Sequence, residues 1–211
     1  CFIFNPLIGL INTGLSNGLT AISDAGYITV LGLILGAMMA IDMGGPINKA
    51  AYVFGTGVLA TASQMIEKGA QPGDPAVQAC YIAMAAIMVG GMVPPIGIAL
   101  ACQFFPKKFT KEERGSKVSN FVMGASFITE GAIPFAAADP IHVLPACIVG
   151  SGLAGALSMA FGCTLMAPHG GIFVFPVVDH AALYCVALAV GSVLGAVILS
   201  LVKKTQPAEA K

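Results

Sequence analysis

The chain has 211 residues, of which 57% are hydrophobic and 9% are charged, and its formal net charge is +0. Soluble domains carry about 25% charged residues, so this composition indicates an integral membrane protein. Without a net charge there is no overall field that attracts nucleic acid, and we exclude that class of partner. The six cysteines stand singly in apolar segments, a spacing that predicts no zinc site, no other metal and no cofactor.

The first part of the chain contains apolar segments of the length that a membrane helix needs, which is about 20 residues. Residues 2–22 form the first segment, and residues 27–41 form a second and more apolar one. The second segment ends at residues 42–46, where glycines and a proline stop helix propagation. Pro46 favours the start of a new helix over residues 47–66. Because the chain begins inside a hydrophobic segment, we expect further N-terminal helices to precede it.

A polar loop is predicted at residues 67–75, which are rich in charge and turn formers. Residues 76–105 are again apolar but contain Pro94 and Pro95, so a long kinked helix and a helix with a broken end both fit. Residues 106–117 carry five basic and two acidic side chains. The positive-inside rule predicts that this loop is cytoplasmic.

Lys203 and Lys204 predict that residues 203–211 form a tail on the same cytoplasmic side. An even number of complete crossings should therefore lie between the loop and the tail. The best candidates for these crossings are residues 141–161 and 181–202.

Two further apolar segments, residues 118–139 and 163–179, are interrupted by glycine and proline. This pattern predicts re-entrant hairpins or discontinuous helices, which transporters place at the membrane midplane. The predicted fold is therefore an all-α polytopic helical bundle with re-entrant hairpins or broken helices. We expect residues 1–211 to form a single membrane-embedded domain, the C-terminal part of a larger transport domain.

Glycines spaced four residues apart predict where helices pack closely, since they let two backbones approach each other. The pairs are Gly14 and Gly18, Gly32 and Gly36, and Gly191 and Gly195. We interpret these pairs as packing positions only.

Glu130 is the first candidate for a site residue, because an ionisable group inside a membrane is costly and is usually functional. It follows Thr129, and Gly131 and Pro134 interrupt the helix around it. Unpaired backbone is tolerated in a membrane only against protein or a water-filled cavity. A carboxylate there could accept hydrogen bonds from sugar hydroxyls and take a proton from one. The alternative is a structural carboxylate paired with a lysine or with backbone amides.

A second polar cluster, Asp42, Asn48 and Lys49, surrounds the glycine and proline break after the second segment. Lys49 could pair with Asp42 as a structural contact, or it could complement Glu130 across a cavity. Both interpretations remain open from the sequence.

The other broken segment contains His169 and Gly170, which follow a proline. His169 could donate a hydrogen bond to a sugar or phosphoryl oxygen, or it could bond to a nearby carbonyl; we favour the site. Asp139 directly precedes Pro140 and an apolar segment, which is typical of a helix N-cap. We expect Asp139 to position the broken segment and not to touch substrate.

Four unusual motifs occur in order along the chain: DMGGPINKAAY at residues 42–52, GMVPPI at 91–96, ITEGAIPFAAADP at 128–140 and MAPHGGIF at 166–173. Together they resemble the membrane-embedded EIIC domain of the bacterial fructose-specific phosphotransferase system. The resemblance covers essentially the whole chain. It lacks the EIIA and EIIB domains and the first EIIC helices, so we expect a fragment or a component that relies on separate chains.

The resemblance implies a multi-pass, homodimeric protein of the bacterial cytoplasmic membrane that transports fructose and couples its transport to phosphorylation. A phosphocysteine on the EIIB partner would donate phosphate to the bound sugar, and EIIB would receive it from EIIA. The chain would thus be the membrane subunit of a transferase, with no covalent chemistry of its own. The family's sugar-contacting carboxylate motif matches the segment around Glu130.

We therefore predict a sugar permease in which three backbone breaks converge on the sugar at the membrane midplane. The predicted substrate-binding residues are Glu130, Thr129, Asn48, Lys49, His169 and Gly170, with Glu130 also catalytic. The predicted structural residues near the site are Asp42, Gly131, Pro134 and Asp139. The alternative function is an ion-coupled secondary transporter that uses Glu130 as a proton or cation site.

Overall fold

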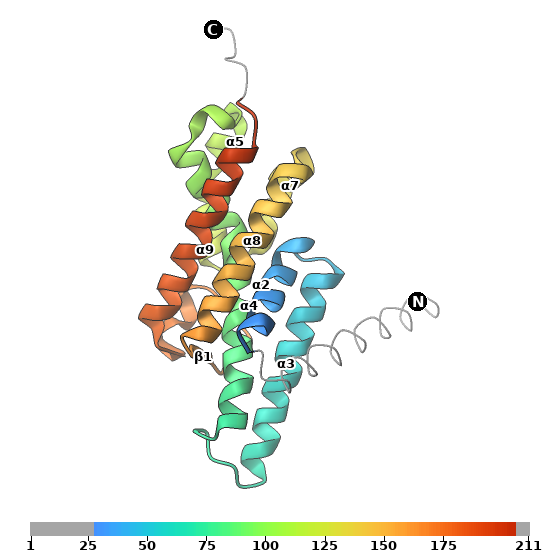
Figure 1. Ribbon diagram of the computed structural model, residues 1–211, viewed down its shortest axis with the longest axis vertical. Coiled ribbons are helices and arrows are strands. Elements are labelled where there is room, and N and C mark those ends of the chain that lie inside the picture. The colour runs from blue at the N-terminus through green and yellow to red at the C-terminus, as the bar shows by residue number, and fades with distance from the viewer. Residues whose placement is uncertain (1–27, 206–211) are drawn as a thin grey trace, which may run out of the picture.

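The computed structural model describes residues 28–205, so the predicted helix at residues 2–22 and the pair Gly14 and Gly18 lie outside the described residues. Helices make up most of the described chain (Figure 1), which confirms the all-α fold. The boundaries predicted for the long helices agree to within one residue at each end. These helices are α2 (Ile28–Ile41), α3 (Pro46–Glu67), α4 (Pro75–Phe104), α8 (Pro140–Ala160) and α9 (Ala181–Val202).

Short elements connect the long helices. Between α4 and α8 lie η1 (Pro106–Lys108), α5 (Lys111–Gly115), α6 (Lys117–Ala125), η2 (Thr129–Ala132) and α7 (Ile133–Ala138). Between α8 and α9 lie β1 (Thr164–Leu165), η3 (Ile172–Val177) and β2 (Val178–Asp179).

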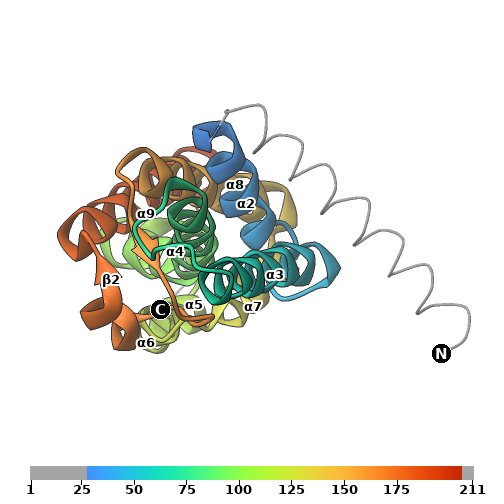
Figure 2. The same cartoon turned by 90° about the horizontal axis from the view of Figure 1, so that it is seen from below.

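The central helix of the bundle is α4, which contacts α2, α3, α6, α8 and α9. Figure 2 shows these helices arranged around it. A helix that is apolar on all sides has to be surrounded by protein or lipid, and every residue from 83 to 99 is buried. Pro94 and Pro95 lie inside this continuous helix. Of the two interpretations of this segment, the structure therefore has one long helix without a broken end.

Three of the described helices, α4, α8 and α9, are long and apolar enough to cross a membrane. One face of α9 exposes a row of large apolar side chains, as expected for a helix in contact with lipid: Val186, Val190, Val193, Val197 and Leu201. By contrast, the described part of α2 has 14 residues and is about 21 Å long at about 1.5 Å per residue. This length is less than the hydrocarbon core of about 30 Å.

The segment α6–η2–α7, which we call the hairpin, enters and leaves at one end of the bundle. Lys203, just after α9, lies 3.0 Å from Glu113 before α6 and 3.8 Å from Asp139 after α7. At the tip, Thr129 donates a hydrogen bond to the carbonyl oxygen of Gly91 (2.8 Å). Gly91 lies in the middle of α4, so the hairpin reaches partway into the bundle and returns. The predicted re-entrant hairpin agrees with this path.

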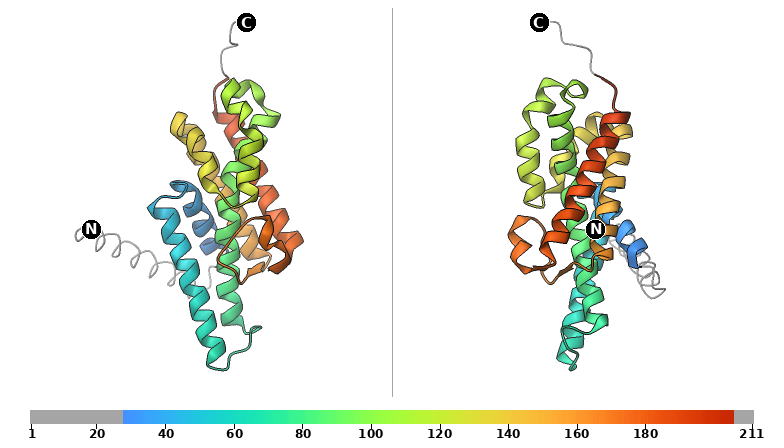
Figure 3. Two further views of the ribbon diagram at one scale, coloured as in Figure 1. Left: turned by 180° about the vertical axis from the view of Figure 1, so that it is seen from behind. Right: turned by 60° about the vertical axis from the view of Figure 1, so that its left-hand side comes forward.

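The end of the bundle that carries both ends of the hairpin also carries most of the basic side chains, and we call it the basic end. Figure 3 shows α5 and α6 at the same end as the C-terminal end of α9. Lys108 of η1 donates a hydrogen bond to the carbonyl oxygen of Lys203 (2.7 Å). The loop over residues 106–117 and Lys203 therefore lie together. Two long helices, α8 and α9, run between them, and their crossing of a membrane stays a prediction.

The segment predicted at residues 163–179 differs from the hairpin. Thr164 pairs with Asp179 and Leu165 with Val178 in an antiparallel ladder. This ladder closes the loop that contains His169 and η3, so no hairpin of helices forms here. Short strands can close such a loop because each pairing satisfies backbone groups on both strands.

Glycines bring α8 close to its neighbours, as two of the predicted pairs require. A methyl group on Gly32 would lie 2.6 Å from the Gly155 carbonyl oxygen. With a larger residue at this position, α2 and α8 could not pack as closely as they do. On the other side of α8, a methyl group on Gly191 would lie 2.6 Å from the Gly150 carbonyl oxygen. Both close contacts involve backbone atoms, which cannot move aside as a flexible side chain can.

Substitution of Gly36 by alanine should destabilise the bundle, because the added methyl group would overlap the Ser151 carbonyl oxygen of α8. We expect a loss of about 1–3 kcal/mol, the usual effect of overpacking a core. The matched control is Gly57→Ala in α3, where a methyl group would meet no atom within 4 Å. Thermal unfolding of the two purified variants measures the difference. A Gly36→Ala variant as stable as Gly57→Ala would contradict the packing described here.

Candidate functional site

Three interrupted segments of the chain come together beside the middle of α4. They are the turn between α2 and α3 (residues 42–45), the tip of the hairpin (126–132) and the loop after β1 (166–171). Gly44 of the turn lies against Glu130 of the tip, and Gly170 of the loop lies against Phe127 of the tip. We call these three segments together the junction.

Glu130 lies in η2 at the tip of the hairpin, and its side chain is exposed. A methyl group on Gly44 would lie 2.8 Å from Glu130 Oε1, so the carboxylate rests directly against the Gly44 backbone. Gly44 has a φ of 111°, a conformation that glycine adopts without a steric cost. The turn therefore leaves room for the carboxylate because it has no side chain at this point.

Asp42 and Asn48 shape the turn. The Asp42 carboxylate accepts hydrogen bonds from the backbone N–H groups of Ile47 (2.6 Å) and Asn48 (2.9 Å). These groups belong to the first turn of α3, where the helix itself offers no acceptor. The buried Asn48 side chain donates to the carbonyl oxygen of Met39 in α2 (2.8 Å). Together they hold the end of α2 and the start of α3 in a fixed relation.

Lys49 does not form an ion pair with Asp42, which was one of the two roles that the sequence left open for it. Its side chain is exposed, and the three ion pairs among residues 28–205 do not include it. The Asp42 carboxylate is instead occupied by the start of α3.

Thr129 and Phe127 anchor the hairpin tip on α4. The buried Thr129 hydroxyl donates to the Gly91 carbonyl oxygen (2.8 Å). The Phe127 ring fills the space that Gly91 and Gly170 leave open, since a methyl group on Gly91 would lie 2.6 Å from Phe127 Cε2 and one on Gly170 would overlap the ring. Phe127 also lies against His169, with ring centroids 6.1 Å apart.

The loop at residues 166–171 is held from a second side by α3. The Tyr52 hydroxyl, one turn after Asn48, donates to the carbonyl oxygen of Pro168 (2.5 Å). His169 is exposed, and its Nδ1 hydrogen-bonds to the Gly170 carbonyl oxygen. Because a carbonyl oxygen only accepts, Nδ1 carries the proton, and Nε2 of a neutral ring is left as an acceptor.

Four of the seven described residues with positive φ lie in the junction. The φ of Met43 is 44° and that of Phe127 is 63°, while Gly171 has a φ of 92°. A positive φ is uncommon for residues other than glycine and costs about 1–3 kcal/mol when the surrounding structure imposes it. Such backbone strain is concentrated at functional sites, which gives an independent reason to regard the junction as one.

The remaining predicted structural residues lie at different points of the hairpin. Gly131 packs in its interior, where a methyl group would lie 2.8 Å from Asn120 Oδ1. Pro134 occupies the first turn of α7 and so starts the return helix. Asp139 occupies the N-cap position of α8, but its side chain makes no cap hydrogen bond. It binds His142 Nδ1 (2.7 Å) and lies near Lys203, so it belongs to the basic end and not to the junction.

Sequence reasoning missed Phe127, Tyr52 and Asn120. Phe127 and Tyr52 are aromatic residues in apolar segments, where such residues are common. Nothing in their spacing predicts which distant residues they contact. Asn120 does carry a sequence signal, since a buried amide in an apolar helix needs hydrogen-bond partners. Its side chain is 3% exposed, and its Nδ2 has no hydrogen-bond partner among the described residues.

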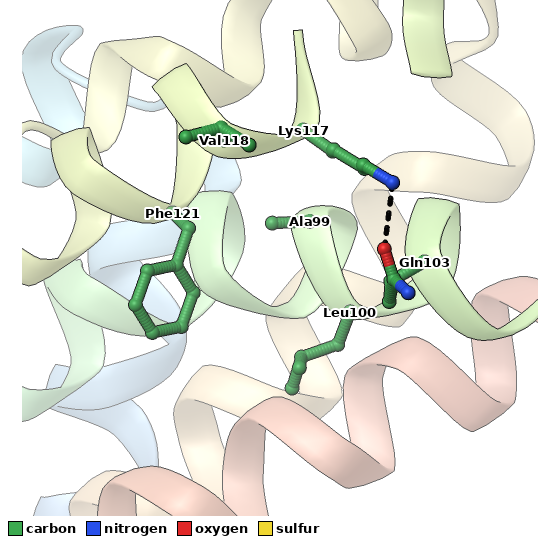
Figure 4. A pocket seen from close by; sticks show the side chains of 6 residues that line it. All are labelled: Ala99, Leu100, Gln103, Lys117, Val118 and Phe121. Atoms are coloured by element: carbon green, nitrogen blue, oxygen red, sulfur yellow. Dashed lines mark hydrogen bonds between the residues drawn. The ribbon is translucent and has the colours of Figure 1, made fainter. Parts of the chain in front are cut away.

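A cavity of about 210 Å³ lies between α4 and the first turns of α6, away from the tip (Figure 4). Its lining is apolar except where Lys117 donates a hydrogen bond to Gln103 Oε1 (2.7 Å). A sugar needs several polar partners, so this cavity does not suit one. The junction instead combines a carboxylate, an imidazole and open backbone. No cluster of three or more metal-ligating side chains occurs among residues 28–205.

Comparison with known proteins gives one family. The family model described as "Phosphotransferase system, EIIC" matches residues 1–150. The chain is 46% identical over 210 residues to the fructose permease IIC component of Bacillus amyloliquefaciens, a match that covers 100% of this chain and 62% of that protein. It is also 46% identical over 203 residues to the PTS system fructose-specific EIIABC component of Bacillus subtilis, covering 96% of this chain and 29% of that protein.

A third relative, the PTS system fructose-specific EIIB'BC component of Xanthomonas campestris, is 52% identical over 178 residues, which covers 83% of this chain and 28% of that protein. The chain thus spans less than two thirds of the length of each of these relatives. No solved structure matches it. On the family match and these identities, the chain belongs to the EIIC family of the phosphotransferase system.

Proposed function

We propose that this chain is the sugar-binding part of a fructose permease of the phosphotransferase system, and that the sugar binds at the junction. The observation that carries this proposal is the convergence of three backbone breaks at the hairpin tip that carries Glu130. Each break exposes backbone or polar side chains at the depth of the middle of α4, where an apolar helix would offer none. The names of these three relatives, which all refer to fructose, support the choice of sugar.

In this proposal the exposed side chains contact the sugar and the buried ones hold them in place. Glu130 accepts hydrogen bonds from sugar hydroxyls, and His169 accepts one at Nε2. Lys49 donates to a hydroxyl from the start of α3. Thr129 and Asn48 fix the tip and the turn through Gly91 and Met39.

Gly170 contributes by keeping the space that Phe127 fills. Phe127 in turn packs against His169, so the size of residue 170 decides where the imidazole lies. This role is indirect, because glycine has no side chain with which to bind the sugar.

The proposed reaction is phosphoryl transfer from a phosphocysteine on an EIIB partner to a hydroxyl of the bound sugar. The P–S bond breaks, a P–O bond forms, and the sugar hydroxyl loses its proton to Glu130, which releases it to water. EIIA recharges EIIB. The basic end faces the cytoplasm, as the positive-inside rule predicts, so the charged product leaves on that side and cannot return. We also propose that the permease crosses the bacterial inner membrane several times and forms a homodimer.

Uptake of labelled fructose tests the coupling. The full-length permease is placed in vesicles with its EIIA and EIIB partners, with and without phosphoenolpyruvate. We expect fructose to appear inside only as fructose phosphate, and only with phosphoenolpyruvate. Accumulation of free fructose under an ion gradient, without phosphoenolpyruvate, would instead support an ion-coupled transporter.

The variant Glu130→Gln should bind fructose about tenfold to 100-fold more weakly, because a hydrogen bond to a charged acceptor contributes about 1.5–3 kcal/mol. Phosphorylation of the sugar should fall at least as far. Glu67→Gln is the matched control, since Glu67 is an exposed carboxylate at the far end of α3. Equilibrium binding of labelled fructose without EIIB isolates the affinity. Unchanged binding and phosphorylation by Glu130→Gln would remove Glu130 from the site.

The variant Gly170→Ala should weaken fructose binding by about tenfold, because the methyl group pushes Phe127 and, with it, the hairpin tip out of place. Gly115→Ala is the control, since a methyl group on Gly115 would meet no atom within 4 Å. The same binding assay is used for both variants. Equal affinities for the two variants would show that the position of Phe127 does not matter to the site.

A further inference from the structure

Lys203 is a lysine with a nearly completely buried side chain, of which 3% is exposed. Its Nζ lies 3.0 Å from Glu113 Oε1 and 3.8 Å from Asp139 Oδ2. The same Nζ lies 4.9 Å above the centre of the Phe109 ring. A buried ammonium group is rare in proteins unless it is paired, and here one cation has two carboxylates and an aromatic face as partners.

The partners of Lys203 stand at the two ends of the hairpin. Glu113 lies in α5, just before α6 begins, and Asp139 lies directly after α7 ends. The Phe109 ring also packs edge-on against Phe135 of α7, with centroids 6.5 Å apart. One side chain at the end of α9 therefore touches the entry of the hairpin, its exit, and an aromatic ring that packs on its return helix.

We infer that Lys203 is a positioning residue for the hairpin, and that it sets the place of the tip that carries Glu130 by binding both ends of the hairpin. The inference rests on the proposed sugar site at the junction. The hairpin is otherwise held at its tip by the Thr129 hydrogen bond and Phe127. Because both its ends and its tip are held, the hairpin can take only one position relative to α4 and α9.

The charges make this contact sensitive to substitution. Removing one partner from a buried ion pair leaves an uncompensated charge, whereas replacing all partners with neutral groups can be nearly neutral for stability. Replacing all three charged partners therefore tests the positioning role of Lys203 without a large loss of stability. A neutral cluster would keep the fold but would no longer draw the two ends of the hairpin together.

The test uses the full-length permease and labelled fructose, with binding measured at equilibrium without EIIB. Lys203→Met should bind fructose about tenfold to 100-fold more weakly, since small misplacements of a binding group have effects of this size. Lys203→Arg, which keeps the charge, should recover most of the affinity. Lys204→Met is the matched control, because Lys204 is the exposed neighbour, and it should bind as the wild type does.

A triple variant, Lys203→Gln with Glu113→Gln and Asp139→Asn, covers the case in which Lys203→Met does not fold. It leaves no buried charge, so we expect it to unfold at nearly the wild-type temperature and still to bind fructose weakly. A thiol introduced as Ile128→Cys at the exposed tip should react with a maleimide at a different rate in this variant than in a protein that carries Ile128→Cys alone. The rate is followed at residue 128 by peptide mass spectrometry, because Cys80 and Cys185 are also partly exposed. A structural role alone would not change that rate in a folded protein.

Wild-type fructose affinity in a folded Lys203→Met or triple variant would overturn the inference. Failure of both variants to fold would overturn it as well, because Lys203 would then serve stability. If the proposed function is wrong, the result is different: the wild-type permease itself does not bind fructose.

Discussion

Hydrocarbon offers no hydrogen bonds, so wherever a helix of this chain is interrupted, protein has to satisfy the freed backbone groups. The structure meets this constraint by placing its interruptions against one another. The turn after α2 is capped by Asp42, the hairpin tip binds Gly91 of α4, and the loop after β1 is held by Tyr52 of α3. Polar groups that would be costly apart are gathered in one place, and this gathering creates the proposed sugar site.

The absence of side chains is as important to this arrangement as their presence. Gly91 and Gly170 together make the space that the Phe127 ring occupies, and Gly44 makes room for Glu130. In the same way, Gly32 and Gly191 let α2 and α9 approach α8. Packing density in protein interiors is high enough that one added methyl group has to be accommodated by movement elsewhere. The glycines of the junction therefore define the shape of the site, whereas those between helices define the distances in the bundle.

Charged side chains occur in two places whose proposed roles differ. At the junction the Glu130 side chain is exposed, and Lys49 is exposed in the first turn of α3. At the basic end, Lys203, Glu113 and Asp139 bind one another, and the pairing offsets the cost of burying them. The hairpin joins the two places, because it begins and ends in the second and has its tip in the first. The proposed role of Lys203 depends on this connection.

The sequence by itself determined the membrane environment, the boundaries of the long helices and the family. Composition, the length of apolar segments and motifs with glycine and proline can all be read locally along the chain. It also predicted the re-entrant path of residues 118–139 from the breaks at Gly131 and Pro134. Tertiary structure alone decided which residues meet. It placed Asp139 beside Lys203 and away from the junction. It also paired the Asp42 carboxylate with the start of α3 in place of Lys49, and packed Phe127 between Gly91 and Gly170. These outcomes depend on how distant helices pack, and the local pattern around a residue carries no information about its distant partner.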